Sequence, residues 1–118
     1  MSSGDSLQGL IEQVNAFADE RDWRQFHSPK NLTMALAVEA AELLEIFQWV
    51  DSNDSLVLTD AQRVASEHEV ADILLYLLRF CEMTGIDLIA AAQDKIKLNA
   101  QKYPVELAKG KATRSIDL

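Results

Sequence analysis

The sequence predicts an all-α protein with four main helices. Apolar residues in four segments recur at the three- and four-residue spacing of amphipathic helices. Each segment carries a capping residue or a helix breaker at an end, and no segment alternates apolar and polar residues as a half-buried strand does. Since 118 residues with 48% hydrophobic content suit one domain, we expect a single domain over 1–118, with 1–5 and 105–118 as tails.

The expected helices are bounded by residues that favour helix ends. Ser28 before Pro29 supplies a capping hydroxyl followed by proline at the first helical position. Thr59 and Gln62 form a capping-box pattern, and Gly85 is a typical C-terminal stop. The four expected helices are 3–23, 29–50, 59–84 and 88–103. The expected N-cap is Asp5 or Ser6 for the first helix and Asp87 for the fourth.

The composition excludes several classes of protein. A net charge of −8 argues against a general nucleic-acid binder. A single cysteine, Cys81, excludes an internal disulfide framework and is typical of the reducing cytoplasm. The longest apolar stretch, residues 70–81, is interrupted by Asp72 and Arg79 and is too short to cross a bilayer. We expect a cytoplasmic protein that binds neither nucleic acid nor membrane.

Two pairs of acidic residues are the main candidate site. Glu39 and Glu42, and later Glu69 and Asp72, are three positions apart, so each pair lies on one face of a helix. Apolar residues flank each pair, so the carboxylates point inward and repel one another unless a cation lies among them. Mg²⁺, or Mn²⁺, suits such oxygen ligands. The alternative is a solvated face in which the acids are structural.

Two charged residues near these pairs have open roles. Glu45 continues the acidic series, and it could orient an attacking water or lie at a solvated edge. Arg79 follows Asp72 by two helical turns, and it could pair with that acid or reach a phosphate. The spacing does not choose between these alternatives.

The C-terminal part of the chain is basic, unlike the rest. Residues 1–94 hold 5 Lys/Arg and 17 Asp/Glu, whereas residues 95–118 hold 6 Lys/Arg and 2 Asp/Glu. Lys95, Asn99 and Lys102 fall on one helix face, with Tyr103 next to it, and could meet phosphates opposite a metal. The alternative is a solvated basic tail.

The third helix suggests an assembly of subunits. Residues 73–81 are apolar around nearly the whole helix circumference, and Arg79 is their one charge. A helix that is apolar all round is buried on all sides. In so short a chain this favours a subunit interface. A non-catalytic helical oligomerisation module is therefore the alternative to an enzyme.

Four motifs, in this order, strongly resemble those of the MazG-like all-α nucleotide pyrophosphohydrolases, and within them the dCTP pyrophosphatase branch. The family pattern is E-x-x-E followed by E-x-x-D, and here 26 residues separate Glu42 from Glu69. The resemblance covers about residues 7–118. The motifs are RDWRQFHSPKNL, EAAELLEIFQW, EVADILLYL and KIKLNAQKYP.

The resemblance implies a MazG-like four-helix bundle, assembled as a dimer or a dimer of dimers. It implies Mg²⁺-dependent hydrolysis of a nucleoside triphosphate to the monophosphate and pyrophosphate, with dCTP or a related or modified pyrimidine nucleotide as substrate. The implied metal ligands are Glu39, Glu42, Glu69 and Asp72; the phosphate contacts are Lys95, Asn99 and Tyr103, with Lys102 and Arg114 as further candidates; the base contacts are Trp23, Trp49 and Tyr76.

One position departs from the dCTP-hydrolysing relatives that the chain resembles. In those relatives we expect a histidine on the first helix, facing the base. Aligned on the RDW motif, this chain has Val14 at that position. The departure leaves the base preference open and does not touch the reaction class. Trp23 and Trp49 also have a structural alternative, as core anchors beside loops.

Overall fold

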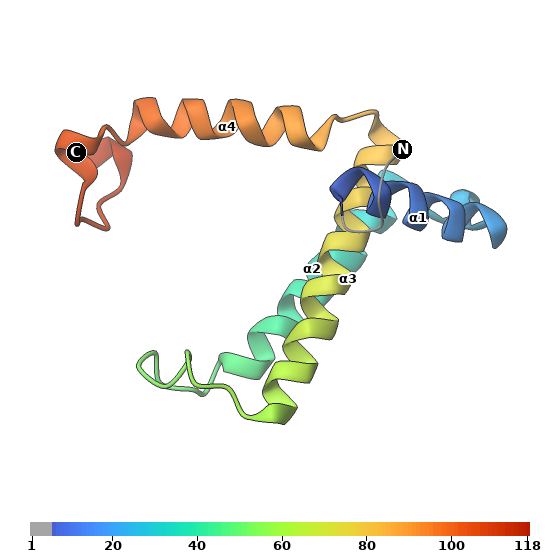
Figure 1. The fold of residues 1–118 in the computed structure, drawn as a ribbon, viewed down its shortest axis with the longest axis horizontal. Helices are drawn as coiled ribbons and strands as arrows, with labels where there is room; N and C mark the ends of the chain where they lie inside the picture. The colour runs from blue at the N-terminus through green and yellow to red at the C-terminus, as the bar shows by residue number, and fades with distance from the viewer. Residues whose placement is uncertain (1–5) are drawn as a thin grey trace. The chain divides into compact units, whose positions relative to one another are not determined.

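The structure is a computed structural model that describes residues 6–118. Within this range the chain is helical and has no strand, so the predicted all-α class is confirmed (Figure 1). The elements are α1 (Leu7–Glu20), η1 (Trp23–Phe26), α2 (Pro29–Phe47), α3 (Asp60–Thr84), α4 (Leu88–Lys102), α5 (Val105–Ala108) and η2 (Ser115–Asp117), where η denotes a 3-10 helix.

The chain divides into two compact units at the end of α3. The first unit ends at Gly85 and holds α1, η1, α2 and α3. The second begins at Ile86 and holds α4, α5 and η2. The acidic pairs belong to the first unit and the basic residues of α4 to the second.

The helices begin at the caps that the sequence predicts. The Oγ of Ser28 accepts a hydrogen bond from the N–H of Asn31, at 3.1 Å. Thr59 and Gln62 form both bonds of the capping box, at 2.9 and 3.1 Å. Gly85 ends α3 with φ of 73°, a left-handed conformation that glycine adopts without steric cost. The remaining two N-caps are Ser6 and Asp87.

Three helices end earlier than predicted, and the C-terminal tail is more ordered. α1 ends at Glu20 because Asp22 adopts a left-handed conformation and a 3-10 helix follows. α2 ends at Phe47 and α4 at Lys102, short of the predicted 50 and 103. The tail, predicted without regular structure, contains α5 and η2. The expected start at Ser3 and the cap at Asp5 lie outside the described residues.

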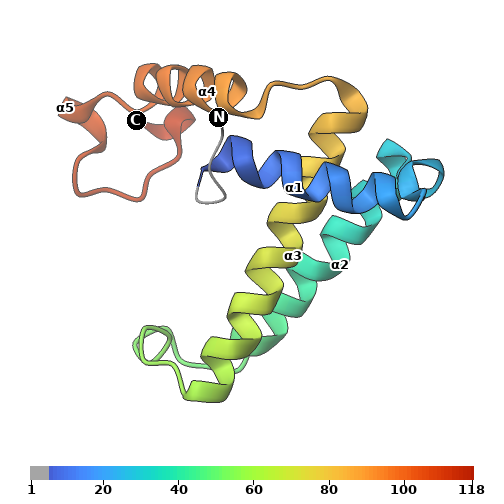
Figure 2. The same cartoon turned by 45° about the vertical axis from the view of Figure 1, so that its right-hand side comes forward.

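The first unit is built on two antiparallel helices, α2 and α3, which run side by side along most of their length (Figure 1). Figure 2 shows α1 crossing the pair near the C-terminal end of α3, and α1 contacts α3 there. The buried apolar core is small and consists of Ala18, Leu32, Leu78 and Cys81. This crossing places α1 against the part of α3 that follows the acidic pair.

The third helix is not buried on all sides within one chain. Of its residues only Leu78, Arg79 and Cys81 are buried, and Val70 is 55% exposed. The predicted subunit interface would cover this apolar surface, and it stays a prediction. No helix in the described part of the chain is both long and apolar enough to cross a membrane.

Removal of the Leu78 side chain should destabilise the first unit strongly. Leu78 is 1% exposed, and a buried Leu→Ala change leaves a cavity that costs about 2–5 kcal/mol. We expect Leu78→Ala to lower the free energy of unfolding by that amount in urea denaturation. The control is Leu56→Ala, the same change at a loop residue that is 90% exposed. Equal losses in both variants would contradict the assigned core.

Candidate metal centre and adjoining cavity

Three carboxylates from α2 and α3 converge on one point. Glu39 comes from α2, and Glu69 and Asp72 come from α3. One carboxylate oxygen of each lies within 4.8 Å of the other two. The helix spacing places each acid on the face that packs against the other helix, so the antiparallel packing brings the three together.

The electrostatics of this cluster show mutual repulsion. The carboxyl of Glu69, close enough to share a proton, raises the pKa of Glu39, and partial desolvation and the charge of Asp72 act in the same direction. The carboxyl of Glu39 likewise raises the pKa of Glu42. Oxygen Oε2 of Glu39 and of Glu69 is buried without a hydrogen-bond partner. The cluster therefore lacks positive charge that would satisfy it from the described residues.

These residues fit a hard divalent cation. A cation would remove the repulsion, and the two unpartnered buried oxygens would become its ligands. Mg²⁺ and Mn²⁺ prefer carboxylate oxygens, and the cluster contains no nitrogen or sulfur ligand. Exposed acidic groups are common without a metal. The two buried oxygens without a partner therefore indicate a cation site here, and the number of acidic residues alone does not.

Glu42 and Glu45 extend the cluster along α2. Glu42 is half-buried beside Glu39 and Glu69, although it lies outside the trio of converging oxygens. Glu45 is exposed, and its negative charge also raises the pKa of Glu42. Glu42 remains a candidate ligand. For Glu45 both alternatives, orienting the attacking water or lying at a solvated edge, stay open.

A cavity adjoins the acidic cluster. Its volume is about 170 Å³, and Asp72 belongs both to its wall and to the cluster. Trp23 and Tyr76, two of the predicted base contacts, line it. The full lining is Val14, Phe17, Ala18, Trp23, His27, Asp72, Leu75, Tyr76 and Arg79. Rings of Phe17 and Trp23 meet edge to face, with centroids 5.5 Å apart, which supports this wall.

Arg79 is buried in the cavity wall, at 2% exposure. Its Nε donates to Nδ1 of His27 at 3.0 Å, and one terminal nitrogen donates to Oδ1 of Asn15 at 2.7 Å. The other terminal nitrogen lies 3.6 Å from the sulfur of Met83. Arg79 therefore pairs with neutral groups, and no ion pair with Asp72 forms among the described residues.

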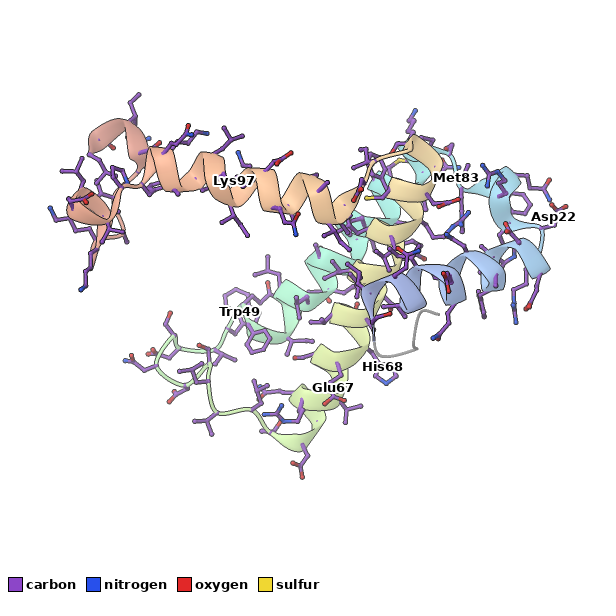
Figure 3. The ribbon with its side chains drawn as sticks, turned by 45° about the horizontal axis from the view of Figure 1, so that its top comes forward. Asp22, Trp49, Glu67, His68, Met83 and Lys97 are labelled. Carbon is purple, nitrogen blue, oxygen red and sulfur yellow. The ribbon has the colours of Figure 1, made fainter. Side chains whose placement is uncertain are left out.

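The acidic cluster and the cavity lining do not include the other predicted site residues. Trp49 is 90% exposed and lies at the opposite end of the α2–α3 pair from Met83 (Figure 3). The predicted phosphate contacts all belong to the second unit: Lys95, Asn99 and Lys102 lie on α4, Tyr103 is its C-cap, and Arg114 pairs with Asp117 at 2.9 Å. Their predicted roles stay predictions.

The sequence alone does not identify the partners of Arg79. The residue is noticeable as the one charge in an apolar run, but the two side chains that bind it come from 52 and 64 positions earlier in the chain. No periodicity in the sequence connects Asn15 with Arg79. His27 stands beside a proline-containing helix start, which marks it as a loop residue and no more.

The fold and the site define a class of protein: a small helical protein with an acidic centre suited to a divalent metal and, beside it, a cavity of single-ring size. The chain belongs to the MazG-like family, whose model matches residues 34–118. The resemblance that the motifs predict is thereby confirmed.

Individual relatives agree with this membership. Bovine dCTP pyrophosphatase 1 is 38% identical over 99% of this chain and 70% of its own length. Mouse dCTP pyrophosphatase 1 is 40% identical over 92% of this chain and 65% of its own length. The chain thus spans about two-thirds of the length of these relatives. A crystal structure of a pyrophosphatase from Archaeoglobus fulgidus DSM 4304 matches with a TM-score of 0.79 and 36% identity, over 88% of this chain and 97% of that one.

Addition of Mg²⁺ should stabilise the protein. Because a cation relieves the carboxylate repulsion of the folded state, we expect the melting temperature to rise with MgCl₂ concentration. Ligand linkage adds about 2.7 kcal/mol at 100 times the dissociation constant. Differential scanning calorimetry against ionic-strength-matched NaCl measures the effect. Glu69→Gln should reduce the Mg²⁺-dependent rise, and an equal rise in this variant would remove Glu69 from the metal site.

Acidification should destabilise the fold through His27. Burial, and then the charge of Arg79, lower the pKa of His27, whose Nδ1 must stay unprotonated to accept the Arg79 bond. The unfolded chain takes up this proton as the pH falls through about 6.5, and the folded chain does so only at lower pH. The contribution is therefore complete above pH 6.5 and declines below it.

The measurement is the change in melting temperature between pH 7.5 and pH 5.5. We expect a larger fall for the unmodified protein than for His27→Asn, because the amide oxygen of asparagine still accepts a hydrogen bond but does not titrate. The comparison cancels the effect of the acidic cluster, which both proteins contain. An equal fall in both would contradict the assignment.

Proposed function

We propose that this protein is a nucleoside triphosphate pyrophosphohydrolase that uses Mg²⁺, with Mn²⁺ as a substitute, and acts on dCTP or a related or modified pyrimidine nucleotide. The products are the nucleoside monophosphate and pyrophosphate. Membership of the MazG-like family and the dCTP pyrophosphatase relatives support the reaction class.

The observation that carries the proposal is the position of Asp72. This one residue belongs to the acidic cluster and to the wall of the adjoining cavity. A nucleotide whose base enters the cavity therefore has its phosphates within reach of the carboxylate cluster. Neither a metal-storage role nor a purely structural role for the acids requires a ring-sized cavity beside them.

The roles of the site residues follow from this arrangement. Glu39, Glu69 and Asp72, together with Glu42, would hold the cation. When bound, a divalent cation neutralises phosphate charge and lowers the pKa of the water that attacks. We assign to Glu45, which is exposed beside Glu42, the orientation of that water through a hydrogen bond that its carboxylate accepts. Trp23 and Tyr76 would enclose the base through their rings.

The assembly completes the proposed site. We assign phosphate contacts to Lys95, Asn99 and Tyr103, with Lys102 and Arg114 as further candidates, and a base contact to Trp49. A homodimer or homotetramer would cover the exposed apolar surface of α3, such as Val70, at a subunit interface. The expected cytoplasmic location is compatible with a nucleotide substrate and likewise stays a prediction.

The test is hydrolysis of dCTP in the presence of Mg²⁺, with chromatographic separation of dCMP and pyrophosphate. We expect Glu42→Gln and Asp72→Asn each to lower kcat on the order of a hundredfold or more, because a lost ligand impairs both metal binding and phosphate neutralisation. The control is Glu67→Gln, which changes an exposed acid on α3, the helix that also carries Asp72 (Figure 3).

Three outcomes bear on the proposal. Release of pyrophosphate from none of the common nucleoside triphosphates would reject it, and would favour the non-catalytic helical module. Full activity in Glu42→Gln or Asp72→Asn would remove that residue from the catalytic site. Release of inorganic phosphate in place of pyrophosphate would reject the reaction class.

A further inference from the structure

The cavity contains a hydrogen-bonding group that the proposed hydrolysis does not use. Arg79 is the one buried charged residue among the described residues. A guanidinium has five N–H bonds, and Arg79 directs three of them to His27, Asn15 and Met83. The other two, one on each terminal nitrogen, have no acceptor among the described residues, and the side chain forms part of the cavity wall.

A buried charge with unused donors is costly unless a ligand accepts from it. The protein groups around Arg79 are neutral, so they satisfy only part of its hydrogen-bonding capacity. The α1 part of the wall, Val14, Phe17 and Ala18, consists of apolar side chains and offers the ligand no hydrogen bond. Recognition of a polar ligand edge therefore depends on α3, His27 and the indole N–H of Trp23.

The cavity lining disfavours a phosphate as the partner of Arg79. Phenyl, indole and aliphatic groups make up most of the lining and offer few hydrogen bonds to the oxygens of an anion. A cavity of about 150 Å³ is known to hold a benzene ring, and this cavity has about 170 Å³. A flat, neutral six-membered ring with hydrogen-bond acceptors on one edge meets both conditions.

We propose that Arg79 is the residue that determines base specificity, and that it selects cytosine over uracil and thymine through two acceptors on one edge of the ring. This inference rests on the proposed function. Cytosine presents O2 and N3 side by side as acceptors, which match two parallel N–H bonds of a guanidinium. Uracil and thymine carry a hydrogen on N3, which faces an N–H bond of Arg79 and cannot accept from it.

The bonds from Arg79 to α1 and to the loop hold its guanidinium plane in place. Nε donates to His27 and one terminal nitrogen donates to Asn15, and these two bonds hold the plane of the guanidinium. A preorganised fork loses little side-chain entropy when the base binds. Lysine, with a single flexible ammonium, would not reproduce the two parallel bonds.

The experiment compares kcat/KM for dCTP and dUTP, with Mg²⁺, in the unmodified protein and three variants. Arg79→Met removes the donors and Arg79→Lys keeps the charge without the fork. The control, Arg63→Met, makes the same change at an exposed position of α3. We expect the unmodified protein to have a higher kcat/KM for dCTP than for dUTP. The ratio of the two values should fall at least about tenfold in both Arg79 variants and stay unchanged in Arg63→Met.

A merely structural role of Arg79 gives a different result. If both substrates lose kcat/KM by the same factor in Arg79→Lys and Arg79→Met, the proposal is overturned, because Arg79 then only supports the packing of α1 on α3. Thermal melting shows whether Arg79→Met folds. Should it not fold, Arg79→Lys decides: a reduced dCTP/dUTP ratio supports the proposal, and an unchanged ratio overturns it.

A binding measurement separates this inference from the proposed function. If no triphosphate is hydrolysed, the proposed function fails, and binding of dCMP and dUMP without metal still tests the cavity. Isothermal titration calorimetry of the unmodified protein measures the two dissociation constants. Tighter binding of dCMP that disappears in Arg79→Lys supports the assignment of Arg79, and equal binding of the two monophosphates by the unmodified protein overturns it.

Discussion

The repulsion among inward-facing carboxylates is the constraint on which this structure depends. α2 and α3 pack antiparallel along their length, and that packing places Glu39 opposite Glu69 and Asp72. The raised pKa of Glu39 and the unpartnered oxygens of Glu39 and Glu69 are consequences of this arrangement. Ordinary core packing would place apolar side chains at these positions. A fold that keeps acids there retains them for a ligand that brings positive charge.

Opposite charges are kept apart along α3. Asp72 and Arg79 are seven residues, or about 10 Å of helix rise, apart, and both line the cavity without forming an ion pair among the described residues. Arg79 is held instead by neutral partners on α1 and in the loop. The carboxylate of Asp72 thus stays available for a metal ion. The guanidinium of Arg79 stays available for hydrogen-bond acceptors on a neutral edge of a ligand.

Much of the fold and part of the site could be predicted because their causes are local. Ser28, Thr59 with Gln62, and Gly85 act within one helical turn, and the structure uses all of them. The three-residue spacing likewise predicts that the members of each acidic pair share a helix face. The ends of α1 and α2 were less predictable, because the last turn of a helix depends on how the following loop packs.

The sequence by itself determined the helical class, the caps of the main helices and the shared face of each acidic pair, because these follow from side-chain chemistry and periodicity within a few residues. Only the tertiary structure decided that Arg79 meets Asn15 and His27, and that Trp23 lines a cavity from which Trp49 is remote. Those relations depend on where α1 crosses α3. A crossing joins residues more than fifty positions apart, whose separation in sequence carries no periodic signal.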